Sequence, residues 1–336
     1  MRAVLCEGPG RLVLVERPEP TPAAGEVLVR IGRAGVCGTD FHIFRGKQPY
    51  LEYPRVIGHE LAGEVMEAPS GSSLEAGQRV AIIPYISCME CAACRRGRTN
   101  CCQRIRVLGV HVDGGLCDYL CVPERNVLPV GDLPLDHAAM IEFLAISAHA
   151  VRRAAPAPGG RALIIGAGPI GMAAMIFAKV RGAQVTALDL RADRLALCRA
   201  ELGADAVVAV GEGTDGALRE ITGGDFYDLV IDATGNAASM ERGFGYVAHG
   251  GTYAFLGIVQ GTITFSDPEF HKRETTLLAS RNATREDFEE VLAAIRTGRV
   301  PVASLNTHRA PLDQVPEILP QWMAPEAGVV KALVEI

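Results

Sequence analysis

Five of the chain's ten cysteines lie within fifteen residues, CMECAACRRGRTNCC, which begin at Cys88. Cys88, Cys91 and Cys94 are spaced C-x2-C-x2-C, and Cys102 follows after seven residues. A short loop with this spacing can present four thiolates tetrahedrally to a single ion. The spacing therefore predicts a closed, structural zinc site, with Cys101 as an alternative fourth ligand. An iron–sulfur cluster and a disulfide pair are the competing interpretations.

A second group of candidate ligands combines sulfur, nitrogen and oxygen. Cys37 lies in GVCGTDFH, and His59 and Glu60 lie in PRVIGHELAGEV. This set suits a catalytic zinc ion that keeps one position open for water or substrate. Glu142, in MIEFLAISAHAV, is the fourth candidate, because a carboxylate in an apolar stretch is costly unless it is paired or binds a metal. The alternatives are core positions for Cys37 and His59 and a solvent-facing helix position for Glu142.

A glycine-rich motif follows a short β-branched run in RALIIGAGPIGMAAM and leads into an apolar helix. Strand, glycines and helix in this order are typical of a dinucleotide-binding site. Gly166 permits the tight turn, Gly168 lets the backbone approach the pyrophosphate, and Gly171 allows close packing of helix on strand. Pro169 and Ile170 complete the motif at the amino terminus of the helix, which attracts phosphates.

The cofactor is expected to be NAD. Asp189 ends the next predicted strand, about twenty residues after the glycines, where an acid binds both ribose hydroxyls and repels a 2′-phosphate. Arg191 and Arg194 lie close enough to influence this preference, and Arg194 is counted among the cofactor-binding candidates. Ligands of such sheets bind at the carboxyl ends of strands, which adds three further candidates: Thr234, Leu256 and Gly257.

The elements that position these residues follow two patterns. The amino-terminal segment MRAVLCEGPGRLVLVERPEP alternates like two strands around a turn. After the glycine-rich motif, strands such as YDLVIDATG alternate with helices, which predicts an α/β fold with a doubly wound parallel sheet. A chain of 336 residues is long enough for two domains with separate cores.

Composition excludes several classes of partner. The net charge of −6 and the aromatic content of 5% argue against nucleic acid or an anionic membrane as the main partner. No stretch approaches the roughly 18 apolar residues of a membrane span. The amino terminus lacks the pattern of a secretory signal, so we expect a cytoplasmic protein. Clustered cysteines in that compartment usually indicate metal binding or redox chemistry.

These motifs together resemble the zinc-dependent medium-chain dehydrogenases over essentially the whole chain. The resemblance is carried by Cys37-Gly-Thr-Asp, Gly58-His-Glu, the four-cysteine loop, the glycine-rich motif and the closing KALVEI. Longer strings, among them YPRVIGHE, AIIPYISC, GVHVDGG and FSDPEFHKRETT, are most similar to the L-galactonate and L-gulonate 5-dehydrogenases of that family. Polyol and L-threonine dehydrogenases share the zinc motifs but resemble these strings less.

The resemblance implies a GroES-like, β-rich catalytic domain of residues 1–150 and 281–336, with the structural zinc lobe at residues 88–102. It also implies that a Rossmann domain of residues 151–280 binds NAD and that the cleft between the domains holds the active site. The expected assembly is a dimer or tetramer with two zinc ions per chain. The implied reaction oxidises carbon 5 of L-galactonate or L-gulonate to give D-tagaturonate or D-fructuronate.

The resemblance also suggests roles for residues around the metal. Thr39 corresponds to a hydroxyl that passes the substrate proton towards the cofactor ribose, and His42 continues this relay or packs beside the ribose. Arg281 matches a position that faces the active site in polyol enzymes, so it is the first candidate for binding the substrate carboxylate. Asn282, counted with the cofactor-binding residues, could hydrogen-bond hydroxyls. An ordinary turn or cap residue is the alternative role of Thr39. Arg45 and Lys47, in the loop IFRGKQPY, are alternative cations.

Two other functions remain open. The first keeps the chemistry but uses a neutral polyol or L-threonine as substrate. The second is a nucleotide-binding sensor that kept the fold and lost catalysis. The retained set Cys37, His59, Glu60 and Glu142 argues against the sensor, which would be expected to hold one zinc ion per chain where the enzyme holds two.

Overall fold

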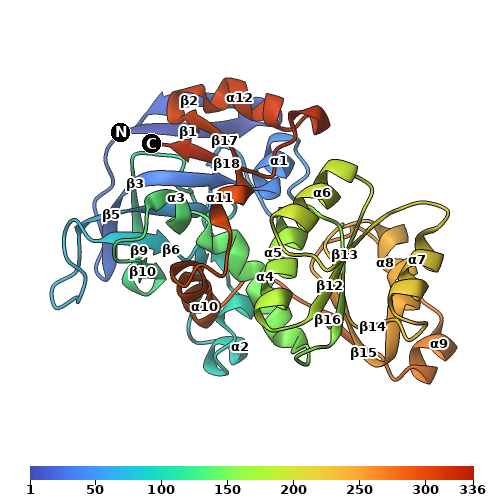
Figure 1. Cartoon of the computed structure of the whole chain (residues 1–336). Helices are drawn as coiled ribbons and strands as arrows, with labels where there is room; N and C mark the ends of the chain where they lie inside the picture. Colours follow the sequence, from blue (N-terminus) through green and yellow to red (C-terminus); the bar gives the residue numbers. More distant parts are fainter. The chain divides into compact units, whose positions relative to one another are not determined.

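The computed structural model describes residues 1–336, which form two compact units. Unit 1 comprises Met1–Phe143, Thr284–Gly298 and Val302–Ile336, and unit 2 comprises Leu144–Ala283 and Arg299–Pro301. Unit 1 thus combines the amino-terminal part of the chain with its end, and β1 and β18, which lie close to the two termini, are both in it (Figure 1). No helix has both the length and the apolar character needed to cross a membrane.

Unit 1 is built mainly from antiparallel strands. A seven-stranded sheet has the order β10-β6-β5-β3-β18-β17, with β9 also paired to β3. A three-stranded sheet has the order β2-β1-β4, and β7 pairs with β8. The bounds are β1 Arg2–Gly8, β2 Arg11–Glu16, β3 Glu26–Val36, β4 Arg55–Val56, β5 Glu60–Glu67, β6 Arg79–Ile82, β7 Tyr85–Ile86, β8 Arg106–Val107, β9 Tyr119–Pro123, β10 Val127–Pro129, β17 Asn306–Pro311 and β18 Lys331–Glu335.

Short helices connect these strands. They are α1 Gly38–Phe44, α2 Ala92–Arg95, α3 Leu135–Ala138, α10 Arg285–Arg296, α11 Val302–Leu305 and α12 Val315–Trp322. Buried aliphatic residues of unit 1 form one core with the buried face of α12. They include Ile31 of β3, Leu61 of β5, and Ile57 and Leu116, which lie outside the strands. Helix α4, Ile141–Ala154, begins in unit 1 and continues into unit 2.

Strand register brings distant parts of unit 1 together at the end of β3. Gly35 pairs with Glu60, the first residue of β5, and Val36 pairs with Ala332 of β18. A Cβ atom at Gly35 would overlap the Glu60 carboxylate, so glycine is the residue that fits there. Cys37 follows directly as the amino-terminal cap of α1. This register therefore places Cys37, Glu60 and the start of β18 around one point.

Unit 2 contains the predicted parallel sheet, with strand order β13-β12-β11-β14-β15-β16. From β11 the chain adds strands first on one side and then on the other, so the order reverses between β11 and β14, where such sheets bind ligands. The elements are β11 Arg161–Ile165, α5 Pro169–Val180, β12 Gln184–Asp189, α6 Ala192–Ala200, β13 Ala206–Ala209, α7 Thr214–Ile221, β14 Tyr227–Asp232, α8 Ala237–Gly243, β15 Val247–Phe255, α9 Asp267–Lys272 and β16 Thr276–Ala279.

Candidate functional site

The four-cysteine loop has the geometry of a metal site. The Sγ atoms of Cys88, Cys91, Cys94 and Cys102 all lie within 4.8 Å of one another. The Cys91–Cys94 and Cys88–Cys102 sulfur separations are 3.5 and 3.4 Å, far longer than a disulfide bond of about 2.05 Å. Cys101 is exposed and does not belong to the group. Four buried or half-buried free thiols around one point fit a tetrahedral zinc ion.

The loop stabilises thiolate at Cys88 and Cys91. The pKa of Cys88 is lowered to about 5, first by a hydrogen bond from the backbone of Glu90 and then by the side chain of Arg104, and the pKa of Cys91 is lowered as well. Burial raises the pKa of Cys94 to about 12. A metal binds thiolate rather than thiol, so such donors favour occupation of the site.

The second group, Cys37, His59 and Glu60, likewise has its ligand atoms within 4.8 Å of one another. Asp40 links the backbone segment that carries Cys37 to the segment that carries His59 and Glu60. Its Oδ2 accepts a hydrogen bond from the backbone nitrogen of Cys37 at 2.9 Å, and its Oδ1 accepts one from that of Gly58 at 3.2 Å. Asp40 is completely buried, and its role was not predicted from the sequence. The Cys-Gly-Thr-Asp string contains it, but only the fold shows what it holds.

Two buried polar atoms near this group have no hydrogen bond, as expected at a site for a cation. Nδ1 of His59 and Oε2 of Glu142 are both buried without a hydrogen bond. Burial lowers the pKa of His59, but Asp40 and Cys37 raise it more, and the pKa lies well above its ordinary value. Surroundings that favour a positive imidazole also favour a metal cation, so the residues fit a zinc ion.

Glu142 is buried, with 2% of its surface exposed, which excludes a solvent-facing position. Burial raises the pKa of its carboxyl group to about 7, and the nearby His59 opposes that shift. Its Oε1 accepts a hydrogen bond from the hydroxyl group of Tyr85. Glu142 is not in the group whose ligand atoms lie within 4.8 Å, although it is close enough to His59 and Glu60 to interact electrostatically.

Glu60 is engaged by Lys331, a residue that sequence reasoning missed. Nζ of Lys331 lies 2.6 and 2.8 Å from the two carboxylate oxygens of Glu60 and also donates to the carbonyl of Val36 at 3.3 Å. Both side chains are almost fully buried, and the ammonium lies 4.3 Å from the ring centre of Phe143. The sequence offered one indication of a buried lysine, because Lys331 directly precedes the apolar residues Ala-Leu-Val in the string KALVEI.

Thr39 and His42 lie on α1, directly after Cys37. Thr39 is half-buried in the first turn of the helix, and His42 is exposed in the last turn. The alternative cations Arg45 and Lys47 are exposed just beyond the helix. Thr39 thus follows the candidate sulfur ligand, Cys37, by two residues along the chain.

The glycine-rich loop of unit 2 has the backbone form that its motif predicts. Gly166 has φ of +93°, and a Cβ atom there would press on the methyl group of Thr234. A Cβ atom at Gly171 would overlap the carbonyl oxygen of Gly166, whereas nothing lies within 4 Å of such an atom at Gly168. Gly168 caps α5, with Pro169 and Ile170 in the first turn. The loop is therefore tightly packed on one side and open at Gly168.

The other nucleotide candidates lie at neighbouring strand ends. Asp189 accepts hydrogen bonds from the backbone nitrogens of Ala167 at 2.5 Å and Arg191 at 2.8 Å, so it also holds the loop. Arg194 is buried on α6. Thr234 follows β14, and Leu256 and Gly257 follow β15, the strand paired with it.

Arg281 and Asn282 follow β16 in unit 2, whereas the metal-ligand groups belong to unit 1. Arg281 is exposed, and Asn282 has φ of +51°. Their contact with a substrate stays a prediction.

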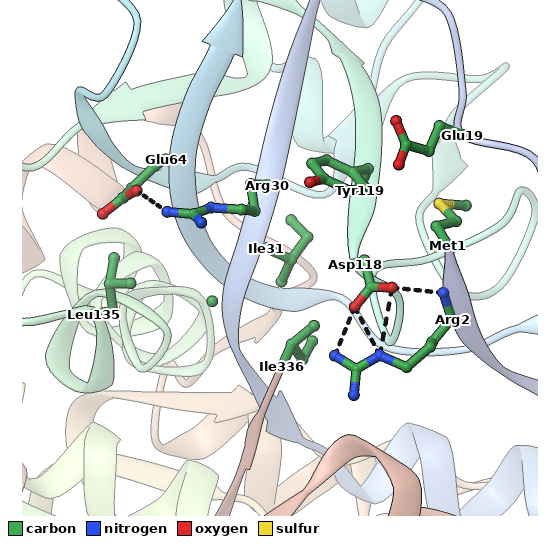
Figure 2. Close-up of a pocket in the computed structure, with 11 residues that line it drawn as sticks. Met1, Arg2, Glu19, Arg30, Ile31, Glu64, Asp118, Tyr119, Leu135 and Ile336 are labelled. Atoms are coloured by element: carbon green, nitrogen blue, oxygen red, sulfur yellow. Dashed lines mark hydrogen bonds and ion pairs between the residues drawn. The ribbon is translucent and has the colours of Figure 1, made fainter.

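A cavity of about 600 Å³ in unit 1 is lined by none of the predicted site residues (Figure 2). Its charged side chains include two ion pairs, Arg2–Asp118 at 2.8 Å and Arg30–Glu64 at 2.5 Å. Because these four side chains are already paired with one another, they are not free to bind a charged substrate. The residues that line the cavity also include no metal-ligand group.

Two sequence families match this chain. "Alcohol dehydrogenase GroES-like domain" matches residues 23–132, and "Zinc-binding dehydrogenase" matches residues 169–297. L-galactonate-5-dehydrogenase of Escherichia coli K12 is 43% identical over 335 residues, which cover 99% of this chain and 98% of that enzyme.

Solved structures agree with this match. The rspB alcohol dehydrogenase of E. coli CFT073, complexed with NADH, has a TM-score of 0.94 at 30% identity and covers 100% of this chain and 99% of its own. A putative zinc-binding dehydrogenase of Sinorhizobium meliloti bound to NADP has a TM-score of 0.92 at 28% identity, with coverage of 100% and 99%.

Proposed function

The chain belongs to the zinc-binding dehydrogenases, and from this premise we propose that it oxidises a sugar acid, L-galactonate or L-gulonate, at carbon 5. The hydride goes to NAD, and the product is D-tagaturonate or D-fructuronate. The observation that carries this proposal is the 43% identity to L-galactonate-5-dehydrogenase over nearly the full length of both chains. We further propose a cytoplasmic homo-oligomer, a dimer or tetramer.

Two zinc ions per chain would have different roles. Cys88, Cys91, Cys94 and Cys102 would hold one ion in a closed shell that stabilises the loop. Cys37, His59 and a carboxylate would hold the other. When bound there, zinc supplies a Lewis acid that lowers the pKa of a substrate hydroxyl group.

The protein's own residues prepare the site for this chemistry. Lys331 compensates the charge of Glu60, which lets a second carboxylate, Glu142, share the buried region. Asp40 keeps the Cys37 and His59 loops in place. Thr39 would pass the substrate proton outward, with His42 as the next group, and the Gly168 backbone together with Asp189 would bind the cofactor.

Replacing Asp189 by asparagine tests the cofactor preference. Asparagine keeps an acceptor oxygen for the loop but removes the charge that repels a 2′-phosphate. We expect the ratio of kcat/KM for NADP to that for NAD to rise about tenfold or more. An unchanged ratio at unchanged thermal stability would contradict the assignment of Asp189.

Replacing Arg281 by alanine tests the carboxylate-binding role. A charge-assisted contact is worth about 1.5–3 kcal/mol, so KM for the acid should rise about 10- to 100-fold. KM for a polyol that is turned over should change little. Arg281→Lys, which keeps the charge but cannot bind both oxygens in a fork, should fall between the wild type and Arg281→Ala. Equal changes for acid and polyol would show that Arg281 does not bind the carboxylate.

The substrate class is tested by the initial rate of NADH formation with five compounds at equal concentration. They are L-galactonate, L-gulonate, sorbitol, galactitol and L-threonine. We expect kcat/KM to be highest for one of the two acids. A higher value for a polyol or for L-threonine would replace the proposed substrate and leave the zinc and NAD assignments in place.

A further inference from the structure

Tyr85 links a part of the fold outside the ligand motifs to the candidate metal site. It begins β7, three residues before Cys88, and only 6% of its surface is exposed. Its hydroxyl group donates to Oε1 of Glu142, fifty-seven residues along the chain. Its ring packs edge-on against Phe288 of α10, with the ring centres 6.2 Å apart at 77°.

The backbone of Tyr85 is held independently of that hydrogen bond. Tyr85 pairs with Val107 in the β7–β8 ladder, which closes the base of the four-cysteine loop. Nδ2 of the buried Asn126 donates to the carbonyl oxygens of Ile83 at 2.7 Å and Tyr85 at 3.2 Å. Because its backbone is fixed in this way, Tyr85 can fix the position of the Glu142 carboxylate through the hydrogen bond from its hydroxyl group.

Three buried carboxylates surround the Cys37–His59 pair, and their oxygens are used differently. Both oxygens of Asp40 accept backbone hydrogen bonds. Both oxygens of Glu60 contact Lys331. Glu142 has Oε1 occupied by Tyr85 and Oε2 buried without a partner. Oε2 of Glu142 is thus the one oxygen of these six that has neither a hydrogen bond nor an ion pair.

We propose that Tyr85 is a positioning residue, whose hydroxyl group holds Oε1 of Glu142 so that Oε2 is presented as a single oxygen ligand to the metal of Cys37 and His59. The inference rests on the proposed function for the existence of that metal. Without the hydroxyl group, Oε1 loses its donor and the carboxylate is free to turn. Groups that orient a ligand in this way typically contribute 10- to 100-fold to metal affinity.

The test is zinc release from the purified full-length protein. Tyr85→Phe removes the hydroxyl group and keeps the ring that packs on Phe288. Under titration with a chromophoric chelator, we expect one zinc ion to bind about 10- to 100-fold more weakly than in the wild type. The other ion, held by four cysteines, should be unaffected. With cobalt at the weaker site, the visible absorption bands should shift.

A matched control and a double variant separate positioning from general loosening. Tyr253→Phe removes a fully buried hydroxyl group in unit 2 that donates to the carbonyl of Met240 at 2.9 Å, and zinc release should not change. In a Glu142→Gln background, Tyr85→Phe should add little, because both changes act through one carboxylate.

Unchanged zinc affinity in Tyr85→Phe, or a full additional loss in the Glu142→Gln background, would overturn the inference. A wild-type protein that binds only the four-cysteine zinc would overturn it as well. Because zinc release is measured without substrate, failure of the sugar-acid proposal leaves this test intact.

Discussion

Replacing Cys37 by serine should lower kcat/KM by about three orders of magnitude and reduce the zinc content from two ions per chain to one. A Lewis acid contributes several kcal/mol to the transition state, and about 4 kcal/mol corresponds to this loss in rate. Serine is a good amino-terminal cap, so α1 should keep its start. Steady-state kinetics and metal analysis of the same preparation give both values.

Cys6→Ser is the matched control for this change. Cys6 is a completely buried thiol of unit 1 outside both ligand groups, and its Sγ contacts the carbonyl of Gly8 at 3.4 Å. The control should keep two zinc ions and nearly full activity. If Cys37→Ser also kept both, Cys37 would not be a metal ligand.

The second large effect is expected at the four-cysteine loop. Cys94→Ser should remove one zinc ion and destabilise the protein by at least about 4 kcal/mol, because structural zinc contributes directly to folding. For a protein of this size the loss corresponds to a fall in Tm of about 6 °C. Arg95, Arg96 and Arg98 are exposed in the loop, so trypsin should cut there faster once the metal is lost.

Cys101→Ser supplies the control within the same loop. Its side chain is exposed and lies outside the group of four sulfurs. Zinc content, Tm and the rate of tryptic cleavage should match those of the wild type. Loss of zinc from Cys101→Ser with retention in Cys102→Ser would reverse the assignment of the fourth ligand.

The family, the fold class and the enzyme class were predictable because their signals are local, and all three predictions are confirmed. The cysteine loop is complete within fifteen residues, and the glycine-rich motif lies between one strand and one helix. The choice between Cys101 and Cys102 was not predictable, since it depends on the turn at Thr99–Cys101, which leaves Cys101 exposed.

The partners of the candidate ligands required the fold. Lys331 and Glu60 are 271 positions apart, and they meet because β18 and β5 both pair with β3. Tyr85 lies in β7, three residues before the cysteine loop begins, and nothing in its local sequence indicates a contact with Glu142. The substrate contact of Arg281 was suggested by the family resemblance alone. Neither the sequence around Arg281 nor its position in unit 2 identifies a substrate.

The central claim is that hydride leaves carbon 5 of a sugar acid for NAD, and one measurement tests it directly. L-galactonate and L-gulonate carrying deuterium at carbon 5 are incubated in turn with the protein and NAD, and the NADH formed is analysed by mass spectrometry. We predict that the NADH from the substrate that is turned over contains one deuterium atom. Unlabelled NADH, with the deuterium retained in the oxidised product, would contradict oxidation at carbon 5.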